Sequence, residues 1–77
     1  MNSIRSPKNK FRGVIYFDKA IKEIGSVISF SSNDIQALKD LCTQQAGIHP
    51  SRIVILENKA LYPSFDWVEV ERFDLNK

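Results

Sequence analysis

The chain of 77 residues contains a single cysteine, Cys42, and a single histidine, His49. One cysteine excludes an internal disulfide, which favours a cytoplasmic location. Zinc sites need several such ligands, so we expect no metal. No apolar run approaches the roughly 18 residues of a membrane span. The polar start over residues 1–7 is not typical of a secretory signal. We therefore expect that the protein binds no cofactor and does not associate with a membrane.

Catalytic motifs are also missing. The three glycines, Gly13, Gly25 and Gly47, are isolated, so no phosphate-binding loop is indicated. Cys42 falls on the apolar stripe of a predicted helix, where a cysteine is usually a small hydrophobe. Because His49 lies past the end of that helix, nothing indicates a nucleophile and a base held together. We expect no catalytic residue and no enzyme.

Four acids gather near the end of the chain. Paired carboxylates can serve acid–base chemistry. Acids on an edge strand also discourage aggregation, and this is the explanation we favour for Asp66, Glu69, Glu71 and Asp74.

The composition predicts one small folded domain. A hydrophobic fraction of 43% exceeds that of a disordered chain. The length lies near the lower limit for a self-sufficient core. The net charge of +2 does not by itself indicate a nucleic-acid partner. We expect residues 1–10 to form a basic flexible arm and residues 11–77 to form a single α+β domain.

One amphipathic helix is predicted from about Ser32 to Ala46. Capping oxygens and an early acid occur at 31–34. Gly47 suits the left-handed position after the last turn, and Pro50 stops the helix. Apolar residues recur at helical spacing, and we expect this stripe to be buried; it comprises Ile35, Leu38, Leu41 and Cys42.

Four extended segments surround this helix. Residues 11–18 and 24–30 predict a hairpin with a turn at 19–23. The apolar run over 51–56 predicts a central strand, followed by a turn at 57–59. Pro63 marks an entry loop, and a last strand is predicted over 65–73. The fold class is thus α+β, a two-layer ββαββ sandwich with a four-stranded, mainly antiparallel sheet and one helix.

A single helix covers only one face of such a sheet. Side chains alternate between the two faces along a strand, so residues at alternate positions share a face. The expected core residues are Phe11, Ile15, Phe17, Ile28 and Phe30. The opposite face is expected for Tyr16, Val14 and Val27. We expect these three residues to line the uncovered face, while Trp67 fits either face. Such a face packs on a second copy or meets a foreign partner. The predicted partner-binding residues are Tyr16, Val14, Val27, Trp67, Arg12, Lys10 and Lys8.

The basic block near the start supports an alternative. This block has no acid within it and comprises Arg5, Lys8, Lys10 and Arg12. Together with Tyr16, these are the predicted nucleic-acid-binding residues of the alternative. Arg12-Gly13 with Tyr16 is similar to the aromatic sheet strand of RNA-recognition domains. The chain departs from that pattern, because Val14 stands where an aromatic belongs and a second helix is missing.

Two further resemblances are partial. The passage from Asn33-Asp34-Ile35 through Gly47-Ile48-His49-Pro50 to Ile53-Val54-Ile55-Leu56 resembles the helix-to-strand passage of ubiquitin-like β-grasp proteins. It covers about a third of the chain and implies the fold alone, since a conjugating Gly-Gly tail is not seen. In layout only, the chain resembles small phage-encoded inhibitors, including anti-CRISPR proteins, which occupy a surface on a larger host complex.

The favoured hypothesis is therefore a non-enzymatic protein-binding module. It is a small cytoplasmic inhibitor from a phage or mobile element, and its partner is a larger host protein or nucleoprotein complex that it blocks sterically. The sequence is also compatible with a homodimer that forms through the uncovered sheet face. The alternative is a small nucleic-acid-binding protein using the basic arm and the sheet aromatics.

Overall fold

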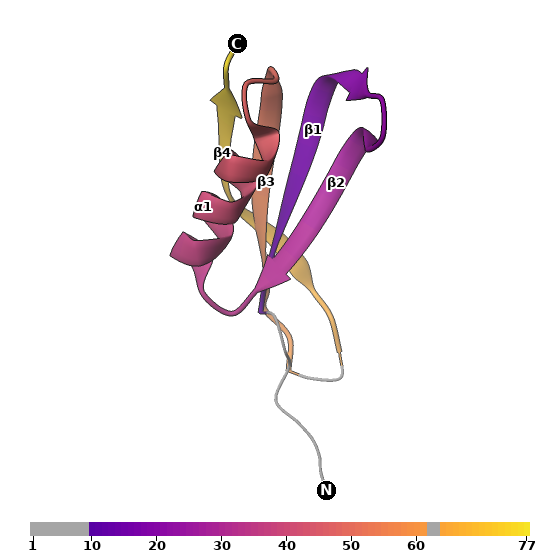
Figure 1. Cartoon of the computed structure of the whole chain (residues 1–77). Helices are drawn as coiled ribbons and strands as arrows, with labels where there is room; N and C mark the ends of the chain where they lie inside the picture. The colour runs from indigo at the N-terminus through magenta and orange to yellow at the C-terminus, as the bar shows by residue number, and fades with distance from the viewer. Residues whose placement is uncertain (1–9, 62–63) are drawn as a thin grey trace, which may run out of the picture.

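The structure is a computed structural model that describes residues 10–61 and 64–77. Its elements follow the order β1 (Phe11–Ile21), β2 (Gly25–Ser32), α1 (Ile35–Ala46), β3 (Ser51–Asn58) and β4 (Trp67–Leu75). The strands form one sheet in the order β2-β1-β3-β4, and all three neighbouring pairs are antiparallel. The predicted α+β fold class and the ββαββ order are confirmed (Figure 1).

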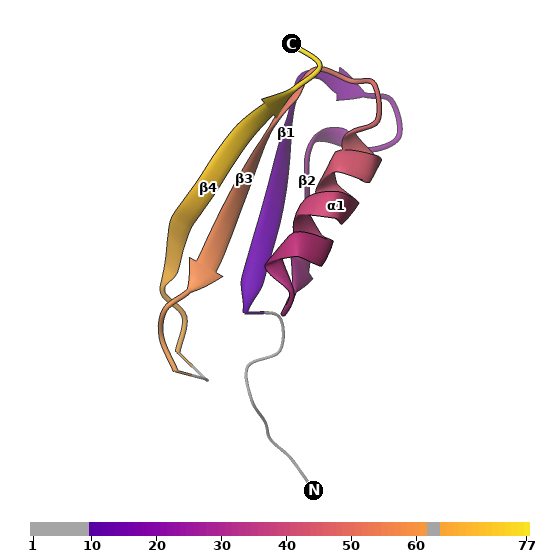
Figure 2. The ribbon, with the colours of Figure 1, turned by 90° about the vertical axis from the view of Figure 1, so that its left-hand side faces the viewer.

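The helix α1 lies against one face of the sheet (Figure 2). It packs mainly on β1 and also contacts β2 and β3. Since β2 and β3 flank β1 on opposite sides, the β2–α1–β3 connection crosses over β1. The other face of the sheet carries no described element, which leaves the molecule with two layers.

The start of α1 differs from the predicted one. The helix begins at Ile35, because β2 continues through Ser32, which pairs with Phe11. Asp34 is the N-cap, and its carboxylate accepts hydrogen bonds from the backbone N–H of Gln36 (3.0 Å) and Ala37 (3.2 Å). The predicted end is confirmed, since Gly47 has a φ of 61° just past Ala46.

The predicted strand ends also need correction. Strand β1 runs to Ile21, so the turn occupies only 22–24, closed by a bond from Ile24 N–H to the Ile21 carbonyl. Strand β2 starts at Gly25 and ends at Ser32. Strand β3 includes Glu57 and Asn58, which were predicted as a turn. Strand β4 covers Trp67–Leu75 rather than 65–73, and Pro63 lies outside the described residues.

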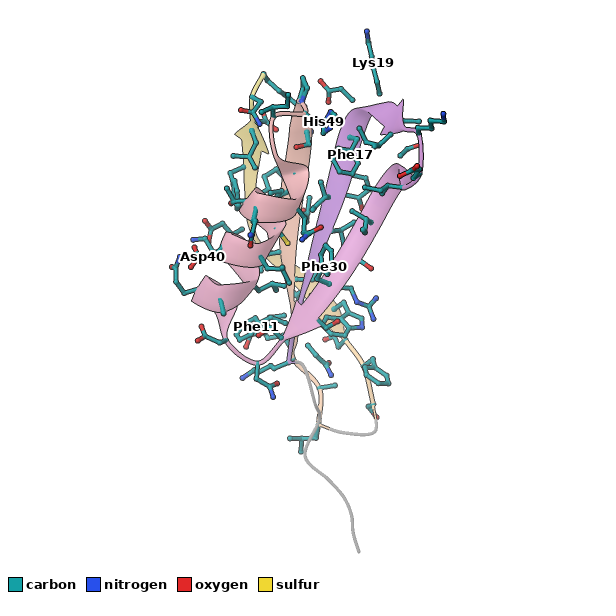
Figure 3. The ribbon with its side chains drawn as sticks, viewed as in Figure 1. Phe11, Phe17, Lys19, Phe30, Asp40 and His49 are labelled. Atoms are coloured by element: carbon teal, nitrogen blue, oxygen red, sulfur yellow. The ribbon has the colours of Figure 1, made fainter. Side chains whose placement is uncertain are left out.

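The core forms between α1 and the centre of the sheet. Its buried members are Ile15, Phe17, Leu38, Cys42, Ala46, Ile53 and Ile55. Phe11 and Phe30 pack against its margin (Figure 3). The expectation that Leu41 is buried was wrong, because this residue is only half-buried and lies outside the cluster. The buried seam advances in steps of four along Leu38, Cys42 and Ala46, and Leu41 lies about 100° away from Cys42 around the helix.

A glycine permits the close approach of α1 to β1. A Cβ atom built at Gly13 would lie 2.5 Å from the Sγ atom of Cys42 and 3.3 Å from the side chain of Leu38. Any other residue would therefore push the helix away from the sheet.

Candidate interaction surface

The sheet face opposite α1 is called the open face. Gly13, Ile15 and Phe17 point toward α1, so the alternate residues of β1 point the other way. The pairing register extends this face across all four strands. The open face comprises Arg12, Val14, Tyr16, Val27, Ser29, Ser31, Arg52, Val54, Leu56, Trp67, Glu69, Arg72 and Asp74.

The predicted residues of the open face differ in exposure. Tyr16 and Val27 pair directly across β1 and β2 and are 46% and 50% exposed. Val14 lies on the same face, between Ser29 and Val54, but is only 9% exposed. Its neighbours on the sheet cover it, so it offers little area to a partner.

Trp67 lies on the open face. The alternation of side chains along its strand had not decided which face it would occupy. It pairs with Asn58 at the start of β4, and the Arg12 guanidinium carbon lies 4.6 Å from the centroid of its ring. The ring of Phe65 stacks on Trp67, with centroids 6.1 Å apart and an interplanar angle of 15°. Phe65 is 64% exposed. Arg12, Trp67 and Phe65 thus form a ladder of planar groups.

Ion pairs line the β3–β4 side of the open face. Arg52 donates from Nε to the Asp74 carboxylate (2.9 Å), and Arg72 donates two hydrogen bonds of 2.8 Å to Glu69. The bond from Arg72 lowers the pKa of Glu69, and the bond from Arg52 lowers the pKa of Asp74. Glu69 also raises the pKa of Arg72. The positive charges here are therefore largely neutralised within the molecule.

A β-bulge creates one of these pairs. Leu56 pairs with Glu69 and Ile55 pairs with Glu71, so Val70 is an extra residue in β4. Glu69 and Arg72 would point to opposite faces of a regular strand. The bulge puts both on the open face.

The open face is hollowed beside Tyr16. The hollow has a volume of about 540 Å³, and its lining includes Tyr16, Arg52, Leu56, Glu69 and Arg72. Its wall is mixed in polarity, because it includes the ring of Tyr16 and the ion pair between Arg72 and Glu69.

The basic residues near the start are only partly described. Lys10 forms an ion pair with Glu57 (3.2 Å), and its backbone carbonyl accepts a hydrogen bond from Asn58. Lys59 and Lys10 together lower the pKa of Glu57. Arg5 and Lys8, and most of the predicted arm, lie outside the described residues.

Of the four acids predicted on the last strand, Glu69, Glu71 and Asp74 lie on the edge strand β4, whereas Asp66 precedes it. Glu71 pairs with Lys39 of α1 (2.9 Å) on the helix side, and Glu69 and Asp74 pair on the open face. Each therefore has a cationic partner. In the ranges 10–61 and 64–77 no cluster of three or more metal-binding side chains occurs.

Cys42 and His49 occupy different surroundings. Cys42 is fully buried in the core, and burial raises its pKa to about 11, so its thiolate is scarce at neutral pH. His49 is exposed, and its ring packs edge-on against Phe17 at 6.1 Å (Figure 3). In the described part of the chain, no helix has the length and apolar character that crossing a membrane requires.

The fold and this surface define a small α+β protein in which no described element covers the second face of the sheet. No family model, curated protein or solved structure matches the chain. Sequence reasoning missed Arg52, Leu56 and Arg72 as members of the open face, and it missed Phe65, which stacks on Trp67 beside it. The parity of Arg52 and Leu56 within their strand was visible, but their neighbours across the sheet were not.

Proposed function

We propose that the chain is a non-enzymatic protein-binding module that docks onto a larger protein through its open face. The observation that carries this proposal is the presence of Tyr16, Trp67 and Arg12 on one uncovered sheet face. Tyrosine, tryptophan and arginine are the residues that contribute most to binding at protein interfaces. Arg12 also rests on the ring of Trp67, so these two side chains contact each other before any partner binds.

The charges around these anchors suit a protein partner. Arg52 and Arg72 are already paired with acids, so the face is a mosaic of both signs rather than a positive field. A partner protein whose charges are complementary can match such a mosaic. Surfaces with a different charge pattern would place like charges opposite one another, and this gives specificity. A polyanion would have to compete with Asp74 and Glu69 for the same guanidinium groups.

Docking alone is sufficient for inhibition. A domain that covers a working surface of a larger complex blocks it sterically and needs no catalytic group. We therefore retain the hypothesis that the chain is a small inhibitor of a host complex. Its resemblance in layout to phage-encoded inhibitors suggests this class of protein.

The test compares matched variants in quantitative pull-downs from the native cell. Tyr16→Ala and Trp67→Ala should each remove a protein that the wild type recovers, because both truncate an anchor. Gln44→Ala, at an exposed position of α1 on the other layer, should recover it as the wild type does. Far-ultraviolet circular dichroism checks that each variant is folded. Equal recovery by all four proteins would reject docking through the open face.

A second candidate function is binding of single-stranded nucleic acid. The ladder of Phe65, Trp67 and Arg12 favours it, because exposed aromatic rings stack on bases of any sequence. The basic residues at 5–12 would then contact phosphates. A gel shift with a labelled oligonucleotide, repeated over a range of salt, decides between the two. Tight binding that weakens steeply with salt, and that Trp67→Ala abolishes, would replace the protein-docking proposal.

A further inference from the structure

The two edges of the sheet differ in their chemistry. Strand β4, at one edge, carries four charged residues and a β-bulge, which are features that keep exposed edges from pairing. Strand β2, at the other edge, has the sequence Gly-Ser-Val-Ile-Ser-Phe-Ser-Ser and contains no charge and no proline. No other described element lies beyond β2 in the plane of the sheet (Figure 1). Within residues 10–61 and 64–77, only the β4 edge is therefore protected.

The hydrogen-bonding side of each β2 residue follows from the register. Asp18 donates its backbone N–H to Pro50, and the Lys10 carbonyl accepts from Asn58, so even-numbered residues of β1 bond toward β3. Along an antiparallel strand the bonding side alternates, so odd-numbered residues of β1 bond toward β2. The register pairs Gly13 with Phe30 and Ile15 with Ile28. Even-numbered residues of β2 thus bond inward.

The odd-numbered residues of β2 consequently face outward. These residues are Val27, Ser29 and Ser31, and their backbones present three N–H and three C=O groups at the free edge. Their side chains lie on the open face, where all three are exposed. This array can serve as a template for another strand.

We infer that two copies of this chain pair through β2, antiparallel and centred on Ser29. In this register Ser29 bonds to Ser29 of the second copy, and Val27 bonds to Ser31. All six outward groups are then satisfied. The result is a continuous eight-stranded sheet with a two-fold axis perpendicular to it.

Side-chain pairing supports a second copy as the occupant and this register in particular. Ile28 comes opposite Phe30 of the other copy at close, non-hydrogen-bonded positions, and such aromatic–β-branched pairs stabilise antiparallel sheets. Both residues are only half-buried in the single chain, although they pack on the core. An uncharged strand meets itself without desolvating any charge, whereas two copies of β4 would bring charged side chains and a β-bulge to the contact.

The two-fold axis has a consequence for binding. It puts both helices on one side of the joined sheet and both open faces on the other. The dimer thus presents two copies of the surface that contains Tyr16 and Trp67, which favours bivalent attachment to a symmetric partner. The dimer itself does not depend on the proposed docking function.

The decisive experiment is a charge swap at the two-fold axis. Analytical ultracentrifugation of the wild type over a range of concentrations should show a monomer–dimer equilibrium. Ser29→Lys and Ser29→Glu should each be monomeric over that range, because each places like charges opposite one another. An equimolar mixture of the two variants should recover the dimer. Val68→Lys, on the exposed edge strand β4, should dimerise as the wild type does.

Amide hydrogen exchange reports the same pairing residue by residue. Val27, Ser29 and Ser31 should exchange slowly in the wild-type dimer and rapidly in Ser29→Lys, while Ile28 and Phe30 stay protected in both. A wild type that remains monomeric at all concentrations would overturn the inference. So would a dimer that survives both Ser29 variants, or one that Val68→Lys abolishes.

Discussion

Gly13 decides how closely the two layers of this protein approach each other. Its missing side chain leaves room for Cys42 and Leu38 of α1, so the core depends on a contact between the backbone of β1 and the inner stripe of the helix. Interiors are packed closely enough that one added methyl group there must displace its neighbours.

The first prediction follows from this contact. Gly13→Ala should destabilise the fold by about 1–3 kcal/mol through overpacking. Cys42→Ala removes the Sγ atom that the new Cβ would meet, so the double variant should lose less stability than the sum of the two single variants. Urea unfolding of all four proteins measures this coupling. Strictly additive losses would show that Gly13 and Cys42 do not compete for space.

Leu38 and Leu41 form a matched pair for a second prediction. Leu38 is fully buried, so Leu38→Ala should cost about 2–5 kcal/mol, which in a domain of this size can abolish folding. Leu41 is half-buried and outside the core cluster, so Leu41→Ala should cost clearly less. Thermal and urea unfolding compare the two. A larger loss at Leu41 would mean that α1 is rotated on the sheet.

Helical spacing in the sequence identified the correct stripe but not its centre. Leu38 and Cys42 were predicted as buried and are, while Leu41 is at the margin. Periodicity fixes which side chains share a face, but the line of contact depends on where the sheet lies. The role of Gly13 could not be predicted for the same reason. It depends on contact with a helix that begins 22 residues later in the chain.

At the scale of elements, pairing rather than composition sets the ends of the strands. Glu57 and Asn58 are polar and resemble a turn, yet they continue β3 because Phe11 and Trp67 pair with them. The buried Asn58 side chain then organises the following loop, since its Oδ1 accepts hydrogen bonds from the backbone N–H of Ala60 and Asp66. The predicted turn at 57–59 was therefore wrong at Glu57 and Asn58, and Asn58 organises the loop from within the strand.

The β3–β4 pair leads to a prediction about pH. The folded state lowers the pKa of Glu69 and Asp74, so it binds these protons less readily than the unfolded chain. The resulting stability is present above the ordinary carboxyl pKa of about 4 and is lost as the pH falls through the lowered values. Stability should thus be level near neutral pH and decline below about pH 4.

Variants without the cations provide the control for this pH dependence. Replacing Arg52 and Arg72 together by glutamine should reduce the acid-induced decline, because the largest interactions that lower these two pKa values are gone. The decline that remains comes from groups such as Glu57, whose pKa Lys59 and Lys10 still lower. Urea unfolding between neutral and strongly acid pH gives the two curves. If the double variant declined as steeply as the wild type, the acid sensitivity would originate elsewhere.

At the scale of the whole molecule, the sheet order brings together residues that the sequence keeps apart. Arg12 rests on Trp67 because β3 lies between β1 and β4 and pairs with both. Parity along one strand predicted that Tyr16 and Val27 share the uncovered face, and the register confirms it. No rule of parity could place Trp67, since strand order and the bulge at Val70 decide the face of β4.

The last prediction concerns how this assembled face would bind. Tyr16 is an anchor that a docked partner desolvates, so Tyr16→Ala should mainly raise the dissociation rate, by the several-fold or more that a loss above about 1 kcal/mol implies. Lys10 lies at the rim and is already paired with Glu57, so Lys10→Ala should change mainly the association rate and its salt dependence. Deletion of residues 1–9 keeps the Lys10 carbonyl that Asn58 uses, and should leave the dissociation rate nearly unchanged. Binding kinetics at two salt concentrations, with Gln44→Ala as the reference variant, separate these effects. If the deletion instead abolished binding and Tyr16→Ala had no effect, the basic segment would carry recognition and the open face would not.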